Sequence, residues 1–237
     1  MLARLQAVLV VSALLAALGW SAWCWQQAVA PGWWLAGLLL LLAPHAPLLA
    51  LEFVLLASVG RDAAVPPASA AQLLQAWAGE VLSGWRVFGW RQPFAASTEA
   101  DVPGQPGRTG VLLLHGYVCN RGLWAPWLQR FRALGVPCQA ITLGPVFGSI
   151  DGCLPQVDAA VQALTRQTGR PPLLVGHSMG GLVARAWLAG QAAVGADPAV
   201  DHPAPRHLAG ALWQHPQCPP DAPAQCLAAG AGRPRAG

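Results

Sequence analysis

The first sixty residues of the chain carry almost no charge, and this feature limits most strongly what the chain can fold into. The 237 residues include 14 basic and 10 acidic side chains, and of these only Arg4 and Glu52 lie before residue 61. Such a long stretch with so few charges is typical of membrane helices rather than of a soluble surface. The sequence therefore divides near Arg61 into an apolar part and a globular part.

Two apolar runs in the first part are long enough to cross a bilayer. Residues 5–25 contain few polar side chains, and at about 1.5 Å per residue they span a hydrocarbon core of about 30 Å. A second run covers residues 33–60, and between the two runs lies an uncharged, tryptophan-flanked stretch that suits a membrane interface. We therefore expect a transmembrane helical hairpin over residues 1–61, with helices at about 5–25 and 33–60.

The flanking arginines indicate an orientation for this hairpin. Arg4 and Arg61 lie on the same side of it, so the positive-inside rule predicts a multi-pass protein of the inner (cytoplasmic) membrane with a cytoplasmic globular part. The alternative is a secretory signal cleaved after Ala30, but Pro31 would follow the cut and the apolar run exceeds the usual length. His45, between two prolines, is interpreted as a neutral side chain bonded to carbonyls at a kink, without a functional role.

Composition argues against several classes of partner. All basic residues are Arg and they form no clustered stripe, so nucleic-acid binding is not expected. The six Cys show neither a C-x-x-C pair nor a zinc spacing, which favours free, mostly buried thiols and predicts no metal site. No obligate protein partner is evident from the sequence.

The globular part shows alternating strand and helix patterns. Residues 62–83 predict a linker followed by a helix at 71–82, and the core is expected at 84–196, with a first strand at 85–90 and a surface connection at 92–108. Further predicted strands lie at 110–114, 137–143 and 172–175, and predicted helices at 121–134, 154–168 and 180–188. This order predicts an α/β fold, a doubly wound and mostly parallel sheet, with chemistry at the carboxyl ends of its strands.

The segment after the last of these strands has the pattern G-x-S-x-G. It reads Gly176-His177-Ser178-Met179-Gly180, with a strand before it and an apolar-periodic helix after it. A tight strand-to-helix turn needs glycine on both sides, because the backbone is crowded where the Ser side chain projects outward. The context predicts that Ser178 is a nucleophile and that His177 packs beside the neighbouring loop rather than acting as a base.

A second group of residues lies at the end of the strand at 110–114. His115 and Gly116 are predicted to support a loop beside the serine, and the backbone N–H groups of Tyr117 and Met179 are predicted to form an oxyanion hole. Two such donors, with the positive end of the following helix, would stabilise the negative charge that develops when a carbonyl is attacked.

The two motifs together carry a family resemblance. HGYVCNRGLW at 115–124 and LLVGHSMGGLVARAW at 173–187 resemble the α/β-hydrolase superfamily, in particular bacterial serine lipases and esterases, over roughly residues 84–190. The resemblance implies hydrolysis of a small acyl ester or lipid through an acyl-enzyme, by a Ser, Asp/Glu and His triad, without a metal or an organic cofactor. Serine at the nucleophile position of the motif argues against the branches of the superfamily that use an Asp nucleophile.

The residues after the serine depart from the pattern of the superfamily. The tail at 197–237 is rich in Pro and Ala and predicts no buried strand, so the sheet is expected to be incomplete at the C-terminus and the triad acid and His stay unassigned. One hypothesis is a shifted reading frame from Pro203, and another is a truncated, inactive α/β protein. Acyl transfer to an acceptor other than water is a third alternative, because it would use the same residues.

Overall fold

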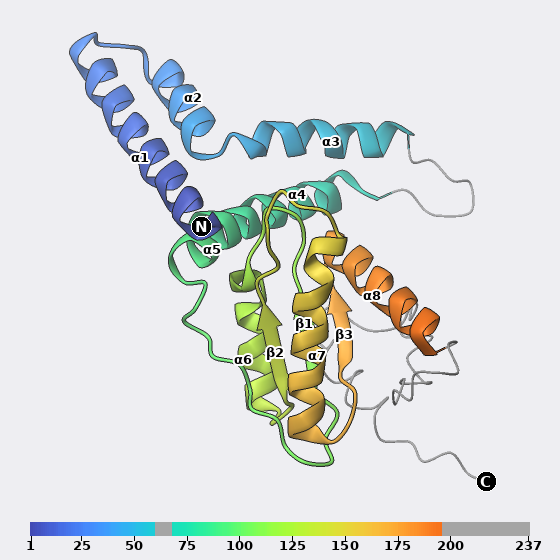
Figure 1. Cartoon of the computed structure of the whole chain (residues 1–237). Coiled ribbons are helices and arrows are strands. Elements are labelled where there is room, and N and C mark those ends of the chain that lie inside the picture. Colours follow the sequence, from blue (N-terminus) through green and yellow to red (C-terminus); the bar gives the residue numbers. More distant parts are fainter. Residues whose placement is uncertain (60–67, 196–237) are drawn as a thin grey trace. The chain divides into compact units, whose positions relative to one another are not determined.

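The computed structural model describes residues 1–59 and 68–195, and the chain forms two compact units, Met1–Ala95 and Ala96–Gly237 (Figure 1). The first unit extends past residue 84, where the α/β core was expected to begin. The tail at 197–237 lies outside the described residues, as does the linker at 60–67.

The first unit begins with a helical hairpin of α1 (Leu2–Gln26) and α2 (Pro31–Leu42). The indole of Trp20 donates a hydrogen bond to the Trp34 carbonyl over 3.1 Å, and the indole of Trp34 donates to the Ser21 hydroxyl over 3.2 Å. Gly37 lets the helices approach, since a Cβ there would lie 2.3 Å from the Trp20 ring. The tryptophans that were expected at the turn thus join the two helices.

The expected second helix at 33–60 is wrong in one respect, because it is broken. α2 ends at Leu42 and α3 (His45–Val59) begins after Pro44, with an angle of 86° between the two axes. Pro44 and Pro47 cannot donate backbone hydrogen bonds, and a proline ring clashes with the preceding turn of a helix. By length and composition α1 could cross a membrane, and α2 with α3 could form one broken span; a signal sequence passes the same test.

The expected helix at 71–82 is confirmed as α4 (Ala70–Gly84), which begins with a capping box between Ser69 and Gln72. The expected strand at 85–90 is wrong. The helix continues as a π-helix, η1 (Trp85–Arg91), and then as α5 (Gln92–Phe94). A strand would need a neighbouring strand, whereas an existing helix gains one hydrogen bond for each added residue without a new nucleation step. The short apolar alternation did not distinguish these outcomes.

In the second unit, residues 96–195 form a three-stranded parallel sheet with the order β2-β1-β3. Its strands confirm three of the predicted strands: β1 (Val111–Leu114), β2 (Cys138–Ile141) and β3 (Leu173–Gly176). All four side chains of the central strand β1 are buried. Burial of each stabilises the fold by about 1.5–3 kcal/mol relative to exposure. The carboxyl ends of the three strands therefore lie together at one edge of a firmly packed sheet.

Helices cover both faces of this sheet (Figure 1). Leu112 and Leu114 face one layer of helices and Val111 and Leu113 face another, because successive side chains of a strand point to opposite faces. The first layer consists of α7 (Leu154–Thr168) and α8 (Met179–Gly195), and the 3-10 turn η3 (Asp151–Cys153) precedes α7. The second layer consists of the 3-10 turn η2 (Arg121–Trp124) and α6 (Ala125–Ala133). The described part of the unit is thus a parallel α/β fold covered on two faces.

Candidate active site

Ser178 occupies the corner between β3 and α8. The strand ends at Gly176 and the helix begins at Met179, so only two residues make the turn. Ser178 has a φ of +52°, in the left-handed region that residues other than glycine rarely adopt, and its side chain is exposed. A backbone held in this region costs of the order of 1–3 kcal/mol, and such strain is concentrated at functional sites.

Glycines at positions 176 and 180 make this corner possible. A Cβ at Gly180 would lie 2.3 Å from the carbonyl oxygen of Leu114, and a Cβ at Gly176 would lie 2.5 Å from the amide nitrogen of Gly181. Both contacts are with backbone atoms, which cannot rotate away as a flexible side chain can. The structure therefore gives the physical reason for glycine on each side of the serine.

The loop after β1 lies directly against this corner. A Cβ at Gly116 would lie 3.1 Å from the Cβ of Ser178 and 3.1 Å from Nδ1 of His177, while the His177 amide donates to the Leu114 carbonyl over 2.9 Å. The next residue, Tyr117, is exposed, and Val118 has a φ of +53°. A left-handed backbone at a β-branched residue is unusual. Among residues 96–195, the two non-glycine residues with a left-handed backbone thus lie in the two segments that the sequence singled out.

His115 is buried and holds the loop after β1 in place. Its Nε2 accepts a hydrogen bond from the Leu143 amide over 2.8 Å, so its Nδ1 carries the proton and donates to the Gly116 carbonyl over 2.8 Å. Burial lowers the pKa of His115 below its ordinary value of 6.5, and the nearby His177 lowers it further, although the bond to Gly116 raises it. His115 is therefore neutral and fixed, and neither nitrogen is available to act as a base.

His177 lies on the surface, with its ring against Gly116. This position agrees with the prediction that it packs beside the loop. The remaining candidates for a triad acid and base, Asp197, Asp201, Asp221, His202, His207 and His215, lie outside the described residues.

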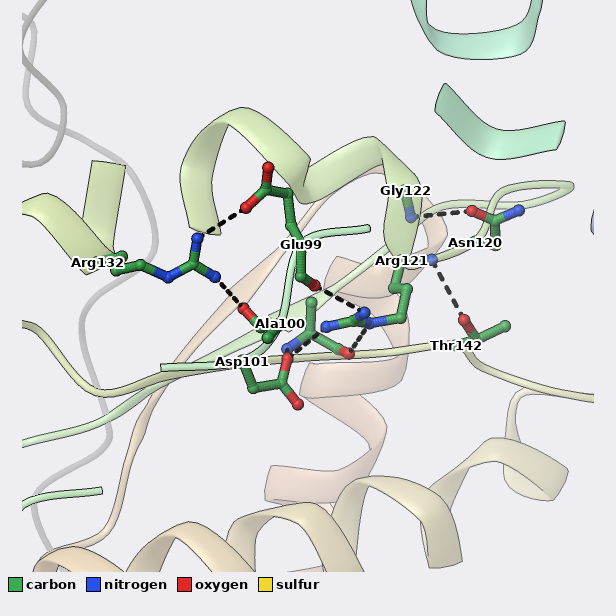
Figure 2. A network of polar contacts seen from close by, with 9 residues as sticks. Glu99, Ala100, Asp101, Asn120, Arg121, Gly122, Arg132 and Thr142 are labelled. Atoms are coloured by element: carbon green, nitrogen blue, oxygen red, sulfur yellow. Dashed lines mark hydrogen bonds and ion pairs between the residues drawn. The ribbon is translucent and has the colours of Figure 1, made fainter. Parts of the chain in front are cut away.

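A polar network holds the far end of the same loop, and Figure 2 shows it. Arg121 donates to the carbonyls of Ala140 and Glu99 over 2.9 Å each and to the Asp101 carboxylate over 2.5 Å. Its own amide donates to the hydroxyl of Thr142 over 3.2 Å. The guanidinium thus ties the segment after the loop to β2 and to residues 99–101.

A second arginine completes this network from α6. Arg132 donates to the carboxylate of Glu99 and to the carbonyl of Ala100. The hydrogen bonds that the Glu99 carboxylate accepts from Gln129 and from Arg132 lower the pKa of Glu99 below its ordinary value. Next to them, Val102 and Cys138 exchange two backbone hydrogen bonds, so the segment expected to be a surface connection covers the outer edge of β2. This network is not evident from the sequence, because no local spacing connects residues 99–102 with residues 121–142.

Cysteine is excluded as a competing nucleophile at two places near the sheet. Burial raises the pKa of the Cys138 and Cys153 thiols, so neither forms a thiolate at neutral pH. In the described part of the chain, no three His, Cys, Asp or Glu side chains gather closely enough to hold a metal ion.

Two hollows of the described surface are lined by residues other than Ser178. One of about 350 Å³ lies beside residues 101–104, and another of about 350 Å³ lies between α7 and α8. Ser178 is not among the residues that line either of these two hollows.

The geometry at this strand edge agrees with a comparison against known families. A model of the alpha/beta hydrolase family matches residues 111–236, which is more than half of the chain. The chain belongs to the alpha/beta hydrolase family. The region of this alpha/beta hydrolase that matches begins at β1, later than the predicted start near residue 84, and it continues past residue 190 into the tail. Searches of curated proteins and of solved structures found no significant match.

Proposed function

We propose that this alpha/beta hydrolase is a membrane-anchored serine esterase that forms an acyl-enzyme at Ser178. The observation that carries the proposal is the exposed Ser178 side chain on a strained backbone between β3 and α8. Neither an ordinary helix nor an ordinary turn needs this combination of strain and glycine packing. The substrate is a carboxylic ester with an acyl chain, either a small molecule or a lipid, and no cofactor takes part.

The amides around the corner support a specific oxyanion hole. The amides of His177, Gly180 and Gly181 already donate to backbone carbonyls. Those of Tyr117 and Met179 make no hydrogen bond within residues 1–59 and 68–195. Met179 is the first residue of α8, where helix N–H groups lack an intrahelical partner. These two amides are therefore the donors we assign to the developing oxyanion, and each such donor is worth about 3 kcal/mol.

The proposed reaction follows two steps. The Ser178 hydroxyl attacks the ester carbonyl, its proton passes to a general base, and the bond to the alcohol breaks as that base returns the proton to the leaving oxygen. Water then attacks the acyl-enzyme, and the acid is released. His115 is unsuited as the base because both of its ring nitrogens are occupied. Since the family match extends to residue 236, His202, His207 and His215 are the residues to test in this role.

The membrane anchor is the second part of the proposal. α1 is long and apolar enough to span a bilayer, α2 with α3 can form a broken span, and we propose the inner membrane with the hydrolase unit in the cytoplasm. N-terminal sequencing of the mature chain separates the anchor from a cleaved signal. A chain that begins at Met1 supports the anchor, and one that begins at Pro31 contradicts it.

A fluorophosphonate probe tests the catalytic part, because it modifies activated serine hydroxyls covalently. We expect the purified full chain to be labelled, the Ser178→Ala variant not to be labelled, and the Ser97→Ala variant, which changes another exposed serine, to be labelled like the parent. Equal labelling of parent and Ser178→Ala would refute the assignment. So would absence of labelling from a parent chain whose circular dichroism shows a folded α/β protein.

A further inference from the structure

The expected helix at 71–82 and the segment expected to be a strand at 85–90 form one continuous helix over residues 70–94. α4, η1 and α5 follow one another without a break, and the residues at the two joints, Trp85 and Gln92, both have right-handed helical backbones. Hydrogen bonds to other helices of the first unit hold this helix in place.

One side of the 70–94 helix is bonded to the break between α2 and α3. The indole of Trp85 donates to the Leu42 carbonyl over 2.8 Å, and the indole of Trp77 donates to the Ala46 carbonyl over 2.9 Å. Close by, Nε2 of His45 lies 3.3 Å from the Val81 carbonyl. Prolines 44 and 47 disturb the helical hydrogen bonds here, and carbonyls at such a break need other donors when they lie in an apolar environment.

The end of the 70–94 helix is also fixed to α1. Gln92 is fully buried, and the side chain of Gln6 donates to it over 3.3 Å. The helix therefore contacts the candidate membrane span at one end and the broken span along its length. Any bilayer that surrounds α1 would lie next to it.

The 70–94 helix also exposes large apolar side chains. Leu74 is 63% exposed and Trp90 is 64% exposed. The other large apolar side chains exposed on this helix are Leu82, Trp85, Phe88 and Phe94. Soluble surfaces seldom expose so many large apolar side chains on one element, and such exposure points to an interaction surface.

Two arginines lie among these apolar side chains. Arg86 is exposed and Arg91 is half-buried, and neither forms an ion pair within the described part of the chain. The only acidic residue of the helix is Glu80, so its aromatic end is positively charged. Tryptophan and arginine together suit the headgroup region of a bilayer, where indole rings lie at the boundary and guanidinium groups pair with phosphate.

We infer that the 70–94 helix lies in the headgroup layer of a phospholipid bilayer, with its exposed apolar side chains toward the acyl chains and Arg86 and Arg91 at lipid phosphates. This placement rests on the membrane anchor proposed above. It makes the helix a second membrane contact in addition to α1, parallel to the bilayer surface rather than across it. Anionic lipid strengthens this contact through the two arginines.

Photo-crosslinking to lipid tests the inference on the full chain. The protein is reconstituted into vesicles of phosphatidylcholine, with or without phosphatidylglycerol, that contain a phospholipid with a diazirine on its acyl chain, and adducts are mapped by mass spectrometry. We expect adducts on peptides from residues 82–94 as well as on α1. Adducts on α1 without adducts on 82–94 would overturn the inference and leave the anchor intact, whereas their absence from both would refute the anchor as well.

A matched pair of variants tests the role of the arginines. We expect phosphatidylglycerol to raise the adduct yield on residues 82–94 relative to that on α1, and the double variant R86Q/R91Q to lose this increase. The control R130Q/R166Q, which removes the same charge from exposed positions in the second unit, keeps it. A yield on 82–94 that does not respond to anionic lipid in the parent, or protein–protein cross-links there in place of lipid adducts, would contradict the inference.

Discussion

Replacing Gly180 by Ala should disrupt the corner at Ser178, and replacing its neighbour Gly181 should not. A Cβ at position 180 would lie 2.3 Å from the carbonyl oxygen of Leu114 and 2.7 Å from that of His115, whereas a Cβ at position 181 meets nothing within 4 Å. The two positions are adjacent in the first turn of α8, so they form a matched pair. The same chemical change is expected to have opposite effects.

The size of the effect follows from what the new methyl group would meet. Both atoms near position 180 are backbone carbonyls at the end of the buried central strand, so relief requires α8 to move away from β1. Overpacking of this kind costs about 3 kcal/mol, at the upper end of the usual range. At position 181, Ala removes the helix penalty of glycine and stabilises the fold by up to about 1 kcal/mol.

Thermal unfolding of the detergent-solubilised full chain and fluorophosphonate labelling measure the two consequences. At about 2 to 4 °C per kcal/mol, G180A should lower the Tm of the hydrolase unit by about 6 to 12 °C and G181A should raise it by up to about 4 °C. We also expect G180A to lose labelling and G181A to retain it. A G180A variant with the Tm and labelling rate of the parent would refute the packing argument for the corner.

Three further predictions concern other parts of the chain. Below pH 6.5 the unfolded chain binds a proton at His115 that the folded chain excludes, so the free energy of unfolding should decrease as the pH falls, by up to about 1.4 kcal/mol per pH unit. His115→Gln should abolish this component of the pH dependence of Tm. Arg121→Gln should destabilise the hydrolase unit by about 1–2 kcal/mol in thermal melts, mainly because its hydrogen bonds to two carbonyls are lost. The ion pair with Asp101 contributes little, because Asp101 is partly exposed. A change in Tm as small as that caused by the control Arg130→Gln would contradict this prediction. Gly37→Ala should destabilise the helical hairpin by about 1–2 kcal/mol, because the added Cβ would clash with the Trp20 ring. Gly19→Ala should not, because a Cβ there meets nothing within 4 Å. Equal Tm values for the two variants would refute the proposed packing.

The sequence predicted the features that depend on local patterns. The run at 111–114 and the amphipathic helix at 154–168 each bury one continuous set of apolar side chains, so their periodicity reports their place in the fold. The corner at Ser178 was also predictable in outline, because the steric constraint that requires glycine at 176 and 180 involves a motif of only five adjacent residues.

Features that depend on distant partners were not predictable in the same way. The segment at 85–91 alternates like a strand but continues an existing helix, and only its bonds to Leu42 and the preceding turn show why. The break after Leu42 is caused by Pro44 and Pro47, which are evident in the sequence. One helix over residues 33–60 was nevertheless expected, because the apolar run continues on both sides of these prolines. The partners of Arg121 lie some twenty residues away in both directions, and no motif joins them.

The most direct measurement of the central claim is the mass of the protein during turnover of an activated ester. The full chain is mixed with a p-nitrophenyl acyl ester, quenched with acid at short times, and digested for peptide mapping. The account predicts a single acyl increment on the peptide that contains Ser178, which appears with the burst of p-nitrophenol and is absent from Ser178→Ala. Ester turnover with the acyl group on another residue, or equal turnover by Ser178→Ala, would contradict it.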